Sequence, residues 1–285
     1  MTADRLVNLL AGVTLFEMMV TIGLGVTVAE IVEVARDWRA MARAGLANYV
    51  IVPAAAVTLL LLFHAAPLVA AGFLIAAVCP GAPYGPPFTG MAKGNVTLAV
   101  GLMMVLAGSS AVIAPLLLHL LLPLVSGDRS VEVELGKMIA TLLGNQLLPL
   151  GIGLFIRHRW PKRAERLGKP ARGLSLLLNV ALIGTIVSVQ FDTLSAIPLR
   201  AFGGMTALVL AGVAAGWLLG GRDEPDRRAM AMATSVRNVA VTLVIAAGSF
   251  PGTPAVTAAT AFGLFQTVLV ALLALAWGRL IPSPR

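Results

Sequence analysis

Two short polar stretches interrupt apolar runs of this sequence, and each places a cation beside an asparagine. One is Lys93-Gly94-Asn95-Val96 and the other is Val236-Arg237-Asn238-Val239. Guanidinium and amide groups donate hydrogen bonds to anionic groups, so Arg237, Asn95 and Asn238 are candidate residues for binding an anion. An asparagine at a helix start also caps that helix, and this second interpretation stays open for both asparagines.

The first polar stretch follows a run of prolines and glycines, Cys79-Pro80-Gly81-Ala82-Pro83-Tyr84-Gly85-Pro86-Pro87. Prolines remove backbone N–H donors, and unpaired backbone at membrane depth is tolerated only where it is packed in protein or lines a cavity. The flanking residues are too apolar for a surface loop. We therefore predict a membrane helix that breaks at residues 80–89 and restarts near Met91, with a plain interhelical loop as the alternative. Further candidate binding residues are Tyr84, Thr89 and, beside the second polar stretch, Thr234.

The composition indicates an integral membrane protein in a lipid bilayer. Hydrophobic residues make up 58% of the 285 residues, charged residues 12%, and the mean hydropathy is +0.92. The net charge of +8 is concentrated between apolar runs, as topology signals are, which argues against nucleic acid as a partner. The single cysteine and three scattered histidines show no metal-ligand spacing, and no nucleophile–base pair is evident. We expect no cofactor, no metal and no enzyme activity.

A helix needs about 20 apolar residues to cross the hydrocarbon core. On that measure the sequence predicts an all-α polytopic membrane protein, with one transmembrane domain over residues 1–285. The predicted spans cover residues 6–28, 44–63, 68–102 (broken), 105–125, 131–156, 173–190, 198–219, 229–250 (broken) and 255–280.

Arginine and lysine set the orientation of such a protein. The basic loops follow the first, fifth and seventh spans, and the strongest is Arg157–Arg172, RHRWPKRAERLGKPAR. With nine spans, these loops and the C-terminus lie in the cytoplasm and the N-terminus lies outside, which fits the plasma (inner) membrane of a cell. The two broken spans, third and eighth, then run in opposite directions. Inverted repeats whose broken helices cross near the midplane have this arrangement.

These features resemble the bile acid:sodium symporter family over almost the whole chain. The resemblance implies a core domain with two crossed broken helices, a panel domain beside it, and alternating-access transport of a small or amphipathic organic anion. It is carried by Cys79-Pro80-Gly81, Ala92-Lys93-Gly94-Asn95-Val96, Arg237-Asn238, Gly23-Leu24-Gly25-Val26-Thr27 and Gln146-Leu147-Leu148-Pro149-Leu150.

The chain departs from that family where sodium is held. A serine and an asparagine of the family's first broken helix correspond to Gly85 and Pro86, and two hydroxyl ligands correspond to Ala99 and Met103. Family glutamate and glutamine ligands of the later broken helix correspond to Ala233 and Arg237. A further glutamine ligand of the family corresponds to Asn48. Of these positions, only Asn48 keeps a side-chain oxygen that could bind a cation.

Arg237 therefore has three interpretations. Its guanidinium can take the place of a sodium ion, brace the broken helix through carbonyl groups and favour an anionic substrate. It can pair with local carbonyls without sensing substrate, or it can form an ion pair with an acid on a neighbouring helix. An unpaired arginine at the centre of a span costs about 2.5–3.5 kcal/mol on insertion scales, so we expect partners.

Glu17 is the only carboxylate well inside a predicted span. A buried carboxylic acid is able to relay protons, and the alternatives are a neutral hydrogen-bonded acid or a partner for a basic residue. The favoured function is a sodium-independent transporter of an organic anion. Proton-coupled transport through Glu17, and a membrane receptor that binds its ligand without moving it, are the competing hypotheses. The sequence leaves the oligomeric state undefined.

Overall fold

The computed structural model describes residues 3–126, 134–189, 191–195 and 197–280, and these residues form helices and connecting turns without a strand. Eight stretches are long and apolar enough to cross a membrane. The elements are α1 (Ala3–Gly25), α2 (Val28–Arg36), α3 (Trp38–Leu46), the π-helical turn η1 (Ala47–Ile51), α4 (Val52–Leu62), α5 (Pro67–Ala77), α6 (Gly85–Met91), α7 (Val96–Ser126), α8 (Leu135–Leu142), the π-helical turn η2 (Leu143–Leu147), α9 (Leu148–Arg159), α10 (Pro161–Val189), α11 (Phe191–Ser195), α12 (Leu199–Leu219), α13 (Glu224–Ser235), α14 (Val239–Ser249) and α15 (Pro254–Leu280).

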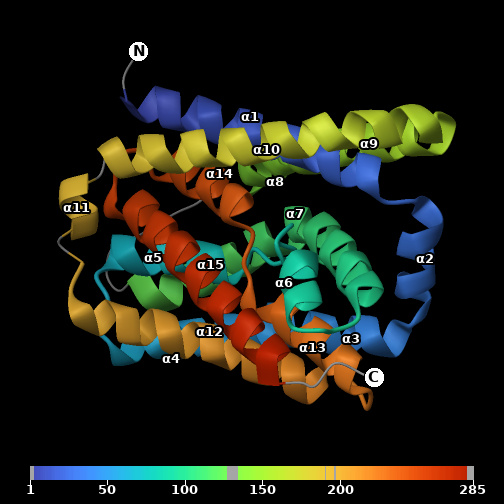
Figure 1. Cartoon of the computed structure of the whole chain (residues 1–285). Coiled ribbons are helices and arrows are strands. Elements are labelled where there is room, and N and C mark those ends of the chain that lie inside the picture. The colour runs from blue at the N-terminus through green and yellow to red at the C-terminus, as the bar shows by residue number, and fades with distance from the viewer. Residues whose placement is uncertain (1–2, 127–133, 190, 196, 281–285) are drawn as a thin grey trace.

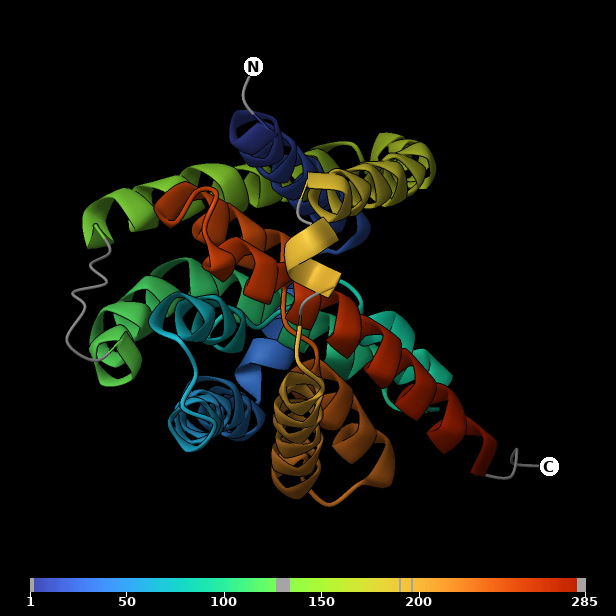
Figure 2. The ribbon, with the colours of Figure 1, turned by 90° about the vertical axis from the view of Figure 1, so that its left-hand side faces the viewer.

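The helices form two layers (Figures 1 and 2). Helices α1, α8–α9 and α10 pack on one another along one side, and we call them the panel layer. The remaining long helices form the core bundle, of which α14 packs against α1. Close approach of α1 and α9 depends on two glycines: a Cβ atom on Gly23 would lie 2.5 Å from the Leu150 carbonyl oxygen, and one on Gly153 would lie 2.3 Å from that of Val20. Small residues allow membrane helices to pack in this way.

The expected third and fourth spans are wrong in their boundaries. The broken helix resumes at Gly85 and ends at Met91, and the next helix, α7, begins at Val96 and runs to Ser126. Lys93 has a φ of 54°, which ends the preceding helix, because a left-handed residue cannot continue it. The fourth span therefore begins nine residues earlier than the expected residue 105.

Other boundaries differ by less. The first span ends at Gly25, and α2 is a separate helix that starts with a capping box of Thr27 and Glu30. The hydrogen bonds from Thr27, backbone first and then side chain, lower the pKa of Glu30. The basic stretch expected as a loop is largely helical, with a turn only at Trp160, because α9 runs to Arg159 and α10 begins at Pro161. Residues 131–133 and 190 of the expected spans lie outside the described residues.

Both π-helical turns carry a buried amide side chain, and π-helical turns inside helices are frequent at functional sites. Asn48 lies in η1 of the core bundle, and Gln146 lies in η2 of the panel layer. Gln146 donates to the Ala107 carbonyl oxygen and, over 3.1 Å, to the Ser110 hydroxyl, both on α7. This amide therefore joins the panel layer to the core bundle.

Candidate functional site

The two interruptions of membrane helices meet in the core bundle. The first spans residues 78–84, between α5 and α6, and the second spans residues 236–238, between α13 and α14. The Asn238 backbone N–H donates to the Cys79 carbonyl oxygen over 2.8 Å, and its side-chain amide donates to the Gly81 carbonyl oxygen over 3.3 Å. The expected contact between the two breaks is confirmed, although the first break ends five residues earlier than expected and Thr89 lies within α6.

Asn238 holds the crossing together in two ways. Its side-chain oxygen accepts from the Val241 backbone N–H over 3.2 Å, so it caps α14, as one of its two interpretations expected. Its backbone N–H satisfies the Cys79 carbonyl oxygen, whose partner in a continuous helix would be the nitrogen of Pro83, and its amide nitrogen satisfies the Gly81 carbonyl oxygen. The side chain is fully buried and uses both ends of its amide within the protein.

Arg237 lies at the centre of this crossing and is 2% exposed. Its guanidinium donates to the Asn48 side-chain oxygen over 2.9 Å, to the Ala77 carbonyl oxygen over 3.3 Å and to the Thr234 carbonyl oxygen. Ala77 and Thr234 lie in the last turns of α5 and α13, where the helix dipole carries partial negative charge. Two helix C-termini and an amide oxygen therefore surround the cation.

No carboxylate pairs with Arg237 among the described residues, where the ion pairs are Lys137 with Glu134 and Arg228 with Glu224. The interpretation that an acid on a neighbouring helix neutralises Arg237 is thus wrong for the described part of the chain. Among the described residues, the groups that bond this guanidinium are neutral oxygens, as they are around many bound cations.

Gln266 is a site residue that the sequence analysis missed. Its side-chain oxygen accepts from the Arg237 backbone N–H over 3.0 Å, and its side-chain nitrogen donates to the Arg237 carbonyl oxygen over 2.9 Å. Through these two hydrogen bonds, Gln266 of α15 fixes the backbone at the break between α13 and α14. A signal was present, since Gln266 is a lone amide in an apolar span and is 1% exposed.

Asn48 orients the remaining members of the site. Its amide nitrogen donates to the Ala44 carbonyl oxygen over 3.0 Å and to the Thr234 hydroxyl over 3.2 Å, which leaves its oxygen for Arg237. Thr234 therefore belongs to the Arg237 network, whereas the Thr89 hydroxyl donates within its own helix to Gly85 over 2.9 Å. Tyr84 is half-buried in the first break and stacks on Phe88.

Asn95 lies outside the crossing that holds Asn238. Its side-chain oxygen accepts from the Leu98 backbone N–H over 3.1 Å, so Asn95 caps α7, and the capping interpretation is confirmed for it. Its amide nitrogen donates to the Asp226 carboxylate over 2.8 Å, at the start of α13. Asn95 thus ties the connection between α6 and α7 to the beginning of the second broken span, and the nearby Lys93 belongs to the same connection.

Five positions that the resemblance is expected to match with sodium ligands carry no side-chain oxygen. A Cβ atom on Gly85 would lie 3.8 Å from the Cα atom of Ala233, so the two broken spans are in van der Waals distance there. All five are buried, and nothing in their side chains is able to bind a hard cation. They are Gly85, Pro86, Ala99, Met103 and Ala233.

Glu17 lies away from this network, between α1 and α10 of the panel layer. Its carboxylate accepts from the Thr21 hydroxyl over 2.7 Å and from the Ser175 hydroxyl over 2.6 Å. The side chain is half-buried. Of the three interpretations, the described contacts favour a hydrogen-bonded acid over a partner for a basic residue.

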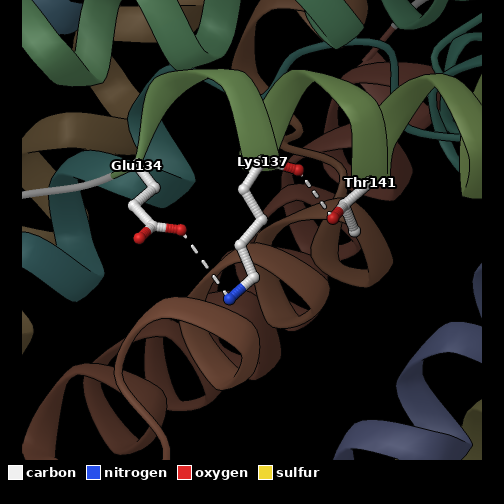
Figure 3. A network of polar contacts seen from close by, with 3 residues as sticks. All are labelled: Glu134, Lys137 and Thr141. Carbon is white, nitrogen blue, oxygen red and sulfur yellow. Dashed lines mark hydrogen bonds and ion pairs between the residues drawn. The ribbon is translucent and has the colours of Figure 1, made fainter.

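A crevice of about 220 Å³ lies between α8 of the panel layer and the end of α14 in the core bundle. Lys137 faces Glu134 across 3.8 Å on α8, and the Thr141 hydroxyl donates to the Lys137 carbonyl oxygen over 2.8 Å (Figure 3). The Lys137 and Glu134 side chains are largely exposed. Sequence analysis did not single out Lys137, whose position beside α14 arises only from tertiary packing.

Apolar spans, two interrupted helices in contact, and a buried polar crossing define a polytopic membrane protein built as transporters are. The sequence model of the Sodium Bile acid symporter family matches residues 12–197, and the chain belongs to that family. The relatives include a Bacillus subtilis (strain 168) protein named "Uncharacterized protein YbaS", 29% identical over 74% of this chain and 70% of the relative.

Two mammalian relatives have names that refer to transport. The rat "Sodium/bile acid cotransporter 5" is 32% identical over 38% of this chain and 24% of its own length. The bovine "Sodium-dependent organic anion transporter" is 25% identical over 61% of this chain and 46% of its own length. Family and relatives thus point to a transporter and not to an enzyme.

Proposed function

We propose that this protein is a secondary transporter of a small or amphipathic organic anion that works by alternating access without sodium. The observation that carries the proposal is the Arg237 guanidinium, buried at the crossing and bound by oxygens of Asn48, Ala77 and Thr234. The names of the mammalian relatives support the substrate class. In this proposal the panel layer and the core bundle move against each other around the crossing.

The contacts of Arg237 support its role as a tethered cation. Sodium is a hard cation and requires a cage of oxygens, and here neutral oxygens surround a guanidinium instead. Because the guanidinium cannot leave, the crossing carries a permanent positive charge in a region of low dielectric. That charge favours an anion nearby, and Asn238, Thr234, Thr89 and Tyr84 are our proposed neighbours of the substrate. Asn95 is left out of this set because it lies outside the crossing, at the start of α7, where its side chain bonds Asp226.

The proposed orientation places the N-terminus outside the plasma membrane and the C-terminus in the cytoplasm. Its support is the distribution of basic residues. Two connections rich in arginine meet at one end of the molecule, because the turn at Gly221 lies beside Arg43. We call the end with these residues the basic end. The broken spans α5–α6 and α13–α14 would then be related as inverted repeats.

Transport should not respond to sodium. A sodium ion about 4 Å from the guanidinium would be repelled by about 4 kcal/mol at an effective dielectric of about 20, which is as large as the binding free energy of a site with a Kd of about 1 mM. The measurement is uptake into proteoliposomes, in sodium against choline buffer, of the organic acid that most raises the melting temperature in a thermal-shift screen. A sodium stimulation of tenfold or more would contradict the proposal.

The Arg237→Gln, Ala233→Glu double variant should also fail to gain sodium dependence, because the side chains of Gly85 and Pro86 still lack oxygens.

The proton-coupled alternative rests on Glu17 and has its own test. Two hydroxyl groups donate hydrogen bonds to the Glu17 carboxylate, and the side-chain oxygen of a glutamine can accept in its place. We therefore expect Glu17→Gln to keep uptake within about twofold. The variant should also respond to a pH gradient as the parent does. The measurement is uptake with and without an imposed gradient. If uptake by the parent accelerates with an inward proton gradient and Glu17→Gln loses that acceleration, coupling through Glu17 replaces our proposal. Ligand binding without any flux would favour a receptor.

A further inference from the structure

A second cavity lies in the core bundle, away from the contact between the panel layer and the core bundle. It has a volume of about 360 Å³, which is within the range of small-molecule sites. Helices α4, α5, α12 and α15 line it, and it begins where α4 ends and α12 starts. These helix ends belong to the end of the molecule opposite the basic end. Its walls are almost entirely apolar side chains, including Leu59, Phe73 and Met205.

Among the described lining residues of this cavity, Arg200 is the one that carries a permanent charge, and none is a carboxylate. His64 also contributes to the lining. Arg200 lies in the first turn of α12, where a cation opposes the helix dipole, so helix stability does not account for it. It takes part in no ion pair among the described residues. A guanidinium at the membrane–water boundary beside an apolar cavity complements a ligand with an anionic head and an apolar chain.

We propose that this cavity binds an amphipathic anion, with one alkyl chain inside the cavity and the anionic head at Arg200. This site is distinct from the crossing, because its lining includes neither Arg237 nor any of its hydrogen-bond partners. The shared chemistry is an acyl chain with an anionic head. A free fatty carboxylate and an anionic phospholipid both have it, and the experiment separates these two sources.

Two adjacent glycines provide a matched pair of variants. Gly204 lines the cavity, and a Cβ atom there would meet only the Phe63 ring, at 3.8 Å, so a leucine would extend into the cavity without striking backbone. Gly203 does not line it, is exposed, and has no atom within 4 Å of an added Cβ. Gly204→Leu therefore fills the cavity, and Gly203→Leu adds the same side chain on the outer face of the same helix. Ala201→Leu is a second filling variant.

The experiment measures binding of labelled dodecanoate to the full chain in phosphatidylcholine nanodiscs, with the melting temperature of each variant as a folding control. We expect saturable binding to the parent and to Gly203→Leu, and at least tenfold weaker binding to Gly204→Leu and Ala201→Leu. Arg200→Gln should weaken dodecanoate binding about fivefold or more but leave competition by dodecanol unchanged. Adding phosphatidylglycerol to the nanodiscs separates the sources. If it displaces dodecanoate from the parent but not from Arg200→Gln, the lipid is the occupant, and if it has no effect, the free carboxylate is.

Three results would overturn the proposal: no saturable binding to the parent, equal binding to a folded filling variant, or equal affinity for dodecanoate and dodecanol. The last result would identify an apolar recess that accepts any chain.

Discussion

Replacing Arg237 with alanine is expected to lower anion uptake more than tenfold and to lower the free energy of unfolding by about 3 kcal/mol or more. The variant leaves the oxygens of Asn48, Ala77 and Thr234 without donors in a buried crossing, and an unsatisfied buried polar group costs about 1–3 kcal/mol. It also removes the positive charge proposed to favour the substrate. The measurement combines melting temperature with affinity for the organic acid found by thermal-shift screening.

The conservative variant Arg237→Lys is expected to recover only part of the activity. A lysine carries the same charge, but its point ammonium cannot reproduce a planar fork that reaches oxygens on three different elements. A tethered-cation role therefore predicts an affinity for the anion between those of the parent and Arg237→Ala. A merely structural arginine predicts reduced stability of both variants with unchanged affinity.

Arg228 provides the matched control for losing a buried arginine. It is 4% exposed, lies on α13, the helix that precedes the break with Arg237, and pairs with Glu224 over 2.6 Å outside the crossing. Arg228→Ala should lower the melting temperature and leave the anion affinity of the folded protein unchanged. If Arg237→Ala and Arg228→Ala behave alike in affinity, the tethered-cation proposal is refuted.

Gly81→Ala is expected to destabilise the protein by about 3 kcal/mol and to abolish most uptake. Gly81 has a φ of 81°, and an added Cβ atom would lie 2.3 Å from the Ala107 backbone nitrogen of α7. A left-handed conformation costs a residue with a Cβ about 1–2 kcal/mol, and overpacking adds about 1–3 kcal/mol. The Gly81 carbonyl oxygen also accepts from Asn238, so a displaced first break would disturb the second.

The measurement for Gly81→Ala is the melting temperature with uptake per folded protein, alongside Gly151→Ala. Gly151 lies in α9 and has no atom within 4 Å of an added Cβ, so alanine there should be neutral or slightly stabilising. A Gly81→Ala variant as stable as Gly151→Ala would show that the first break tolerates a shift of α7.

The sequence by itself determined the class of fold, the presence of two broken spans and the position of the second break. Apolar runs of membrane length and the concentration of proline and glycine at residues 80–87 are local properties, and local chemistry suffices to predict them. Asn238 could be predicted as a cap for the same reason, since a cap bonds the first turn of its own helix.

Tertiary structure decided how the pieces pair. The sequence predicted a restart of the first broken helix near Met91. The observed restart is at Gly85, and Asn95 caps the following helix, α7, and bonds Asp226, 131 residues away. The partners of Arg237 stayed open between carbonyls, an acid and a substrate, because a buried guanidinium is satisfied by whichever oxygens the packing supplies. Asn48, Ala77, Thr234 and Gln266 come from four separate elements, and only the crossing of the broken helices brings them to one arginine.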